Sequence, residues 1–124
     1  MNILLDTHSF LWWQEQSKKL KPHVQYLIAN PENTVYISTA SIWELAIKAS
    51  LGKIKIPKDV KSAISTNHFL ILPVSIDHAL AVQHLPKHHT DPFDRMLVAQ
   101  AIVENLTIVS RDEELKRYDV QVAW

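Results

Sequence analysis

Short apolar runs alternate along the chain with longer segments in which apolar residues recur every three or four positions. The short runs are rich in β-branched and aromatic side chains and predict strands at 2–5, 34–38, 69–74, 106–109 and 120–122. The periodic segments predict a short helix from residue 10 and further helices at 22–29, 41–50, 58–67, 75–84 and 91–104. Strands that alternate with helices indicate a three-layer α/β sandwich with a central, mainly parallel sheet.

The segment around Asp91-Pro92-Phe93-Asp94 predicts the start of the last long helix. Asp91 fits the N-cap, Pro92 the first helical position and Asp94 the third. The apolar run 96–103 then supplies the face that packs on the core. We expect unpaired N–H groups of this first turn to stabilise the charge of Asp94, although both acids could serve only as caps.

Length and composition indicate one folded domain spanning 1–124. Apolar residues make up 47% of the 124-residue chain and charged residues 21%, which argues against disorder. No apolar run reaches the roughly 20 residues of a membrane helix, and the N-terminus lacks the basic start of a signal peptide. The chain has no cysteine, so thiolate metal sites and disulfides are excluded. We therefore expect a cytoplasmic protein with no membrane partner.

Charge and glycine content narrow the possible ligands. The formal net charge is zero, so bulk electrostatics does not indicate a nucleic-acid binder, while a local basic surface remains compatible with the sequence. The single glycine, Gly52, fits the C-terminal cap of the helix that ends near residue 50. Glycine-rich phosphate loops and dinucleotide fingerprints are therefore excluded.

Four acids follow strands or begin helices at the same predicted edge of the sheet. Asp6 follows the first predicted strand, and Asp112 follows the fourth predicted strand. Glu44 lies in the first turn of the helix that follows the second strand, and Asp94 lies in the first turn of the helix that precedes the fourth strand. Right-handed crossovers bring the C-terminal ends of parallel strands to one edge, where ligands of such sheets bind. Four carboxylates gathered there would repel one another unless a cation held them, and hard divalent ions prefer oxygen ligands. A metal-activated water that attacks a phosphodiester is the chemistry that such a site favours.

Each acid also has a simpler explanation as a helix cap. Ser41 and Glu44 match the capping box, in which the glutamate bonds only the serine N–H. Asp6 and Asp112 could each cap a short helix, and Asp91 fits a cap in any case. Four independent caps need not fall on one edge, however, so their shared position favours a site.

Four blocks of the sequence resemble the PIN-domain ribonucleases, and above all the VapC-like toxins of bacterial type II toxin–antitoxin systems. The blocks are 1–8, 38–48, 91–101 and 108–112, and the likeness extends to Trp124. The resemblance implies an endoribonuclease that depends on Mg²⁺, or alternatively Mn²⁺, and that a cognate antitoxin inhibits. It also implies that Asp6, Glu44, Asp94 and Asp112 form the family's acidic quartet. Homodimers are common in this family.

Roles follow from these positions. We expect Asp6 and Asp94 to bind the metal directly or through water, Asp112 to complete the site or bind a second metal, and Glu44 to bind metal or orient the attacking water. Accessory candidates are the extra acid, two hydroxyls that could bond a carboxylate or phosphate, and three cations that could contact RNA phosphates: Asp91, Thr7, Ser110, Lys48, Arg95 and Arg111. Arg95 could instead pair with Asp91, and the three cations could simply be solvated charges.

Other functions fit less well. A response-regulator receiver needs an Asp at the end of strand three, where this chain has Leu72-Pro73-Val74, and an aspartyl phosphatase needs a second Asp where His8 stands. The histidines show no tight zinc-ligand spacing, although His88 or His89 could touch RNA. The main alternative is a non-catalytic PIN-like module that binds RNA or protein, and four intact acids argue against it.

Overall fold

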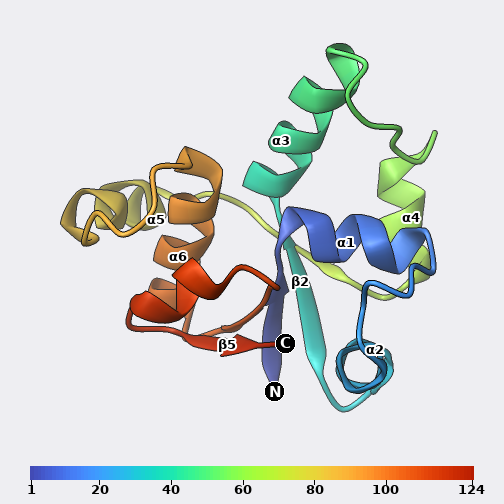
Figure 1. Ribbon diagram of the computed structural model, residues 1–124, viewed down its shortest axis with the longest axis horizontal. Helices are drawn as coiled ribbons and strands as arrows, with labels where there is room; N and C mark the ends of the chain where they lie inside the picture. Colours follow the sequence, from blue (N-terminus) through green and yellow to red (C-terminus); the bar gives the residue numbers. More distant parts are fainter.

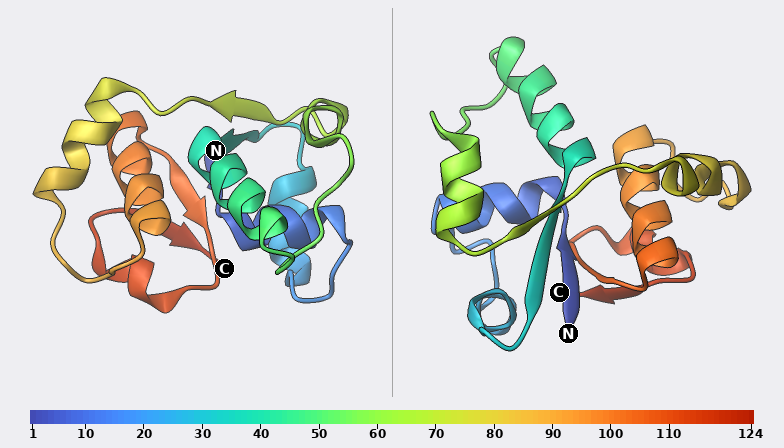
Figure 2. Two further views of the ribbon diagram at one scale, coloured as in Figure 1. Left: turned by 90° about the horizontal axis from the view of Figure 1, so that it is seen from above. Right: turned by 180° about the vertical axis from the view of Figure 1, so that it is seen from behind.

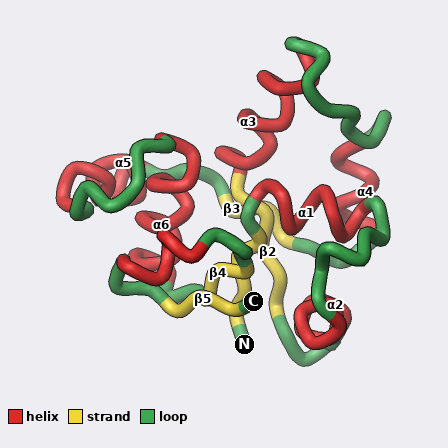
Figure 3. Tube along the Cα trace, viewed as in Figure 1, coloured by secondary structure: helices red, strands yellow, loops and turns green.

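The computed structural model describes residues 1–124 and contains one five-stranded sheet. Its strands are β1 (Asn2–Leu5), β2 (Thr34–Ser38), β3 (Leu70–Leu72), β4 (Thr107–Val109) and β5 (Gln121–Ala123). All neighbours pair in parallel, in the order β3-β2-β1-β4-β5 (Figures 1 and 3). The order reverses beside β1, because the chain runs outward to β3 and then returns to β4 on the other side. The predicted parallel sheet is confirmed.

Helices cover both faces of the sheet and complete the three layers (Figures 1 and 2). On one face, Ile3, Leu5 and Ile37 pack with α1 (Thr7–Gln14), α2 (Pro22–Ala29), α3 (Thr39–Ser50) and α4 (Val60–Thr66). On the other face, Leu4 and Ile108 pack with α6 (Pro92–Glu104) and the short 3-10 helix η2 (Glu113–Arg117). The remaining elements, α5 (Ile76–Ala81) and the 3-10 helix η1 (Val82–His84), lie beside α6. No helix is both long and apolar enough to cross a membrane.

The helix that carries Glu44 begins earlier than the sequence predicts. Ser38 ends β2 and at once caps α3, accepting the Ala40 N–H at 3.0 Å, so the helix starts at Thr39 instead of Ser41. Glu44 therefore lies in the second turn, not the first. The predicted capping box is wrong as well: the buried Ser41 hydroxyl has no hydrogen-bond partner, and Glu44 bonds other residues.

Most other boundaries agree with the sequence prediction. The helix predicted from residue 10 starts at Thr7, because Asp6 directly follows β1 and caps α1. The last strand lies one residue later than expected, and the helix predicted at 75–84 is α5 followed by η1. Gly52 has a φ of 69° and lies just after the end of α3. Its N–H donates to the Ala49 carbonyl, and the Lys53 N–H donates to the Lys48 carbonyl.

Candidate active site

Asp6 lies at the C-terminal end of β1, next to the end of β4. Its backbone N–H donates to the Val109 carbonyl at 3.1 Å, and its Oδ1 accepts the Ser9 N–H at 2.8 Å as the cap of α1. Burial raises the pKa of Asp6, and hydrogen bonds from Ser110 and Ser9 partly offset that effect. Asp6 therefore acts as a cap, and it is also a buried carboxylate in which only part of the desolvation is compensated.

Glu44 projects from the second turn of α3 and is buried, with two partners that hold its carboxylate. The Thr7 hydroxyl donates to Oε1, and the Lys48 ammonium lies 2.9 Å from Oε2. Thr7 therefore bonds a site carboxylate, as one of its predicted roles required. Lys48 forms an ion pair with Glu44, and its predicted contact with RNA phosphates stays a prediction.

Asp94 lies in the first turn of α6, but Asp91 takes the N–H groups there. Asp91 Oδ1 accepts from Phe93 N at 2.8 Å and from Asp94 N at 3.0 Å. Burial raises the pKa of Asp94 to about 7, together with the charges of Asp91, Asp6 and Glu44, while His89 opposes the rise. The expected stabilisation of Asp94 by free N–H groups is therefore wrong, since Asp91 occupies them and adds a repelling charge.

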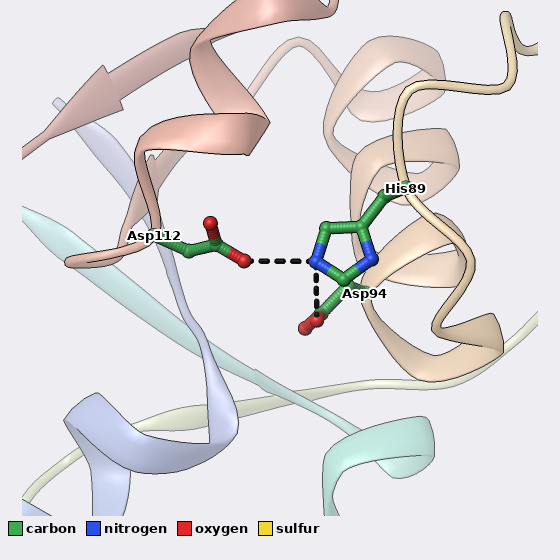
Figure 4. Close-up of side chains that lie close together, drawn as sticks. All are labelled: His89, Asp94 and Asp112. Carbon is green, nitrogen blue, oxygen red and sulfur yellow. Dashed lines mark hydrogen bonds and ion pairs between the residues drawn. The ribbon is translucent and has the colours of Figure 1, made fainter.

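Asp112 follows β4 and meets Asp94 through a histidine. Its backbone N–H donates to the Ser110 hydroxyl at 3.0 Å, and its Oδ1 accepts the Glu114 N–H at 3.0 Å, which caps η2. Its Oδ2 lies 2.8 Å from His89 Nε2, and the same nitrogen lies 3.2 Å from Asp94 Oδ2 (Figure 4). Burial lowers the pKa of His89, but the hydrogen bond that its ring donates to Asp112 and the charges of Asp94, Asp112 and Asp91 raise it overall.

The structure brings the four predicted acids to the C-terminal edge of the sheet. Asp94 and Asp112 share His89, and the charges of Asp6 and Glu44 reach Asp94. Asp6 and Asp112 also line one cavity of about 210 Å³, together with His8, Trp12 and Arg111. The acids thus converge as the topology predicts, and their chemical roles remain predictions.

The three arginines of the chain have different environments. Arg95 donates to the carbonyls of Pro86 at 2.9 Å and Val82 at 3.2 Å, so it fastens a loop and does not pair with Asp91. Arg117 pairs with Glu114 on the surface. Arg111 lies with its guanidinium carbon 4.7 Å from the Trp12 ring centre and makes no hydrogen bond or ion pair within the chain. Arg111 is therefore the one arginine whose donors remain free beside the acidic cavity.

The donor set fits a divalent ion. Oxygen atoms of Asp94 and Asp112 lie within 4.8 Å of each other and of a nitrogen of His89, so both carboxylates could reach one ion. Carboxylate oxygens are the ligands that Mg²⁺ and Mn²⁺ prefer. The raised pKa of Asp94 shows that side chains of the protein only partly compensate this negative charge.

Comparison with known proteins identifies the class to which this fold and site belong. The model of the PIN-domain family matches residues 3–121, nearly the whole chain, so the chain belongs to the PIN-domain family. Ribonuclease VapC22 of Mycobacterium tuberculosis is 25% identical over 119 residues, which are 94% of this chain and 91% of the relative.

Solved structures share the fold. A chain of VapBC2 from Rickettsia felis, crystallised with a fragment of promoter DNA, has a TM-score of 0.73 at 20% identity and covers 100% of this chain and 99% of its own. A chain of FitAcB from Neisseria gonorrhoeae has a TM-score of 0.64 at 23% identity, and the match covers 97% of this chain and 95% of that one. The predicted PIN-like sandwich is confirmed by these structures.

The sequence suggested His89 only as a possible RNA contact and did not place it among the acids of the site. It lies two positions before the N-cap Asp91, where no helix or strand periodicity applies, and its proximity to the acids depends on the path of the loop. The only signal in the sequence is a histidine two positions before an Asp-Pro-Phe-Asp helix start. His88, the other candidate there, instead packs against Tyr118 with ring centres 5.0 Å apart.

Proposed function

We propose that the protein is a metal-dependent endoribonuclease that acts as the toxin of a toxin–antitoxin pair. The observation that carries this proposal is the convergence of Asp6, Glu44, Asp94 and Asp112, in which the pKa of Asp94 rises to about 7. A site evolved only for stability would not gather charges that destabilise one another. The family membership and the ribonuclease relative support the same reading.

Asp6, Asp94 and Asp112 are the residues that would hold Mg²⁺ or Mn²⁺. Such an ion, when bound, would polarise the phosphodiester and lower the pKa of a coordinated water. Glu44 is held by Thr7 and Lys48 in a fixed orientation, which suits a base that orients the attacking water. Ser110 supports this arrangement from the end of β4, because its hydroxyl accepts the Asp112 N–H and also acts to lower the pKa of Asp6.

Arg111 is the residue that would bind the RNA backbone. Its guanidinium lies over Trp12, lines the same cavity as Asp6 and Asp112, and keeps its N–H donors free. A planar guanidinium matches two phosphate oxygens at once. A phosphate bound there would lie beside the carboxylates, which places the RNA next to the ion site.

The partner surface that we propose for the antitoxin lies between α3 and the start of α6, beside α5 and η1. An apolar groove of about 650 Å³ is lined there by Trp43, Val74, Val82, Phe93 and Met96. Trp43 is 64% exposed and packs edge-on against Phe93, with ring centres 5.2 Å apart. Exposed aromatic residues of this kind anchor protein interfaces. A second copy of the chain, forming a homodimer, is the alternative occupant.

RNA cleavage with purified protein tests the activity directly. The wild type should cut single-stranded RNA with Mg²⁺ or Mn²⁺ and lose that activity in EDTA. Asp6→Asn should be inactive, whereas Asp119→Asn, which changes an exposed acid far from the site, should cut normally. Cleavage that persists in Asp6→Asn would refute the assignment, and an inactive wild type that still binds RNA would favour the non-catalytic module.

Growth on induced expression tests the toxin role. Wild-type chain expressed alone should arrest growth, and co-expression of the cognate antitoxin should restore it. Asp6→Asn should be harmless in both cases. Unimpaired growth with wild-type protein that is active in vitro would refute the toxin role and leave the ribonuclease assignment standing.

A further inference from the structure

His89 lies between two carboxylates that come from separate parts of the chain. Its Nε2 is 2.8 Å from Asp112 Oδ2, after β4, and 3.2 Å from Asp94 Oδ2, on α6 (Figure 4). No direct hydrogen bond joins Asp94 to Asp112. The imidazole is therefore the only bridge between these two acids, which would otherwise repel one another.

The second ring nitrogen defines which nitrogen carries the proton. The Asp91 backbone N–H donates to His89 Nδ1 at 3.1 Å. A nitrogen that accepts this bond has no proton of its own, so the neutral ring carries its proton on Nε2. That Nε2–H donates to Asp112 Oδ2, and Asp94 Oδ2 lies 3.2 Å from the same nitrogen.

This arrangement differs from that of a histidine that binds metal. A metal-binding imidazole uses a bare nitrogen for the ion and donates its other N–H to a carboxylate, a carbonyl or water. His89 has the reverse pattern, since Nδ1 faces a donor and Nε2 faces acceptors. Its geometry is that of a residue that orients metal-binding carboxylates.

Hydrogen bonds to Tyr118 and Arg95 hold the loop that carries His89 in place. The His89 backbone N–H donates to the Tyr118 hydroxyl oxygen at 2.9 Å, and Arg95 donates to the same oxygen at 3.3 Å. Arg95 also bonds the carbonyls of Val82 and Pro86, earlier in this connection. These contacts fix the position of the ring independently of Asp94 and Asp112, as a residue that holds others in place requires.

We propose that His89 is a positioning residue that holds Asp94 and Asp112 at the spacing that a divalent ion needs. This inference rests on the proposed function, because it assigns the two acids to the ion site. Asp94 Oδ2 lies 3.2 Å from His89 Nε2, and Asp94 Oδ1 has no hydrogen bond and is free for the ion, while Asp112 Oδ1 accepts the Glu114 N–H. The bridge prepares the ligands before the ion arrives.

Two substitutions at His89 distinguish the effect of the N–H donor from the effect of side-chain bulk. His89→Gln keeps an N–H donor at about the place of Nε2, whereas His89→Leu keeps similar bulk and removes the donor. Removing a residue that orients metal ligands typically weakens metal binding about 10- to 100-fold. We expect that loss in His89→Leu, measured as the Kd for Mn²⁺ by titration calorimetry or EPR, and near wild-type binding in His89→Gln. His84→Leu, a change at an exposed histidine, should bind like the wild type.

Each of the following outcomes would overturn the proposal. Unchanged Mn²⁺ affinity in His89→Leu would show that the bridge does not prepare the ligands, and tighter binding would show that His89 competes with the ion. Nitrogen hyperfine coupling in pulsed EPR of bound Mn²⁺, lost in His89→Gln, would make His89 a ligand. If Asp94→Asn loses Mn²⁺ binding while His89→Leu binds normally, the positioning role of His89 is refuted and the proposed ion site stands. A wild type that binds no Mn²⁺ would refute the proposed function as well.

One measurement needs no variant and so does not depend on how the variants fold. Nitrogen-15 NMR of the wild-type histidines distinguishes a ring protonated on Nε2 from one protonated on Nδ1. The hydrogen bond from Asp91 predicts the Nε2–H form for the neutral His89 ring. A neutral ring protonated on Nδ1 would overturn the assignment.

Discussion

Replacing Asp94 with asparagine should stabilise the protein in the absence of metal. The change keeps the size of the side chain and one oxygen, and it removes the charge that Asp91, Asp6 and Glu44 repel. In the wild type, the folded state holds the Asp94 proton up to a pH of about 7, whereas the unfolded chain releases it near 3.8. Wild-type stability from this group therefore falls as the pH rises from 3.8 to about 7, and the variant escapes that loss.

The size of the effect follows from the same values. The interval from 3.8 to about 7 corresponds to roughly 4 kcal/mol, at about 1.4 kcal/mol per pH unit. The Asp94 side chain is 26% exposed, so water and small movements relieve part of this cost. We expect a gain of about 1–3 kcal/mol at pH 8, which exceeds the helix-dipole contribution of roughly 0.3–1 kcal/mol. For a chain of 124 residues, each kcal/mol raises Tm by roughly 4 °C.

Thermal melts of both proteins provide the assay. In EDTA at pH 8 the variant should melt at the higher temperature, and the difference should shrink as the pH falls toward 4. Millimolar Mg²⁺ should reverse the order, since an ion at about 100 times its Kd stabilises the wild type by roughly 2.7 kcal/mol and the variant by little. Asp119→Asn serves as the control for removing one negative charge elsewhere.

One result would refute this reasoning. If Asp94 were only a helix-start residue, Asp94→Asn would slightly destabilise the protein at pH 8 with or without Mg²⁺, and RNA cleavage would be unchanged. A variant that melts at or below the wild-type temperature in EDTA therefore contradicts the crowding of charges. A variant that cuts RNA at the wild-type rate contradicts the role of Asp94 at the metal.

Three further predictions concern other parts of the site. Glu44→Gln should lower kcat for RNA cleavage about 100-fold or more while Mn²⁺ affinity, measured by calorimetry, stays near that of the wild type. Arg111→Gln, in an Asp6→Asn background that cannot cut, should weaken RNA binding at low salt and reduce the slope of log K against log salt by about 0.7, measured by fluorescence anisotropy. Trp43→Ser should leave Tm nearly unchanged, because Trp43 is 64% exposed, yet cost about 2 kcal/mol in binding a purified antitoxin.

The sequence predicts an element well where a local signal marks both of its ends. The helix α2 has Pro22 at its first position and Asn30 just after its last, and its observed bounds are the predicted ones. The predicted start of α3 was wrong because Ser38 and Ser41 both fit an N-cap. Only the sheet decides between them, since β2 must reach Ser38 to pair with Leu72 of β3. The end of a strand set by a neighbouring strand is not readable from local propensity.

The same distinction explains which site residues the sequence predicts. Asp6 and Asp112 follow strands directly, and Asp94 follows Pro92, so topology alone brings them to one edge. His89 and Arg95 act through the loop that precedes α6, whose path depends on carbonyl contacts and on Tyr118, more than 20 residues away. No spacing rule connects these positions, so the bridge between Asp94 and Asp112 becomes visible only in the fold.

The hydrogen bonds of the four acids suggest why Asp94 would respond most to an ion. Asp6 accepts from Ser9, Glu44 accepts from Thr7 and pairs with Lys48, and Asp112 accepts from Glu114 and His89. Asp94 has only the longer contact to His89, because Asp91 has taken the N–H groups of its own helix. The least compensated carboxylate gains most from a cation. The stability that the folded chain loses at Asp94 without metal therefore becomes affinity for the ion when it binds.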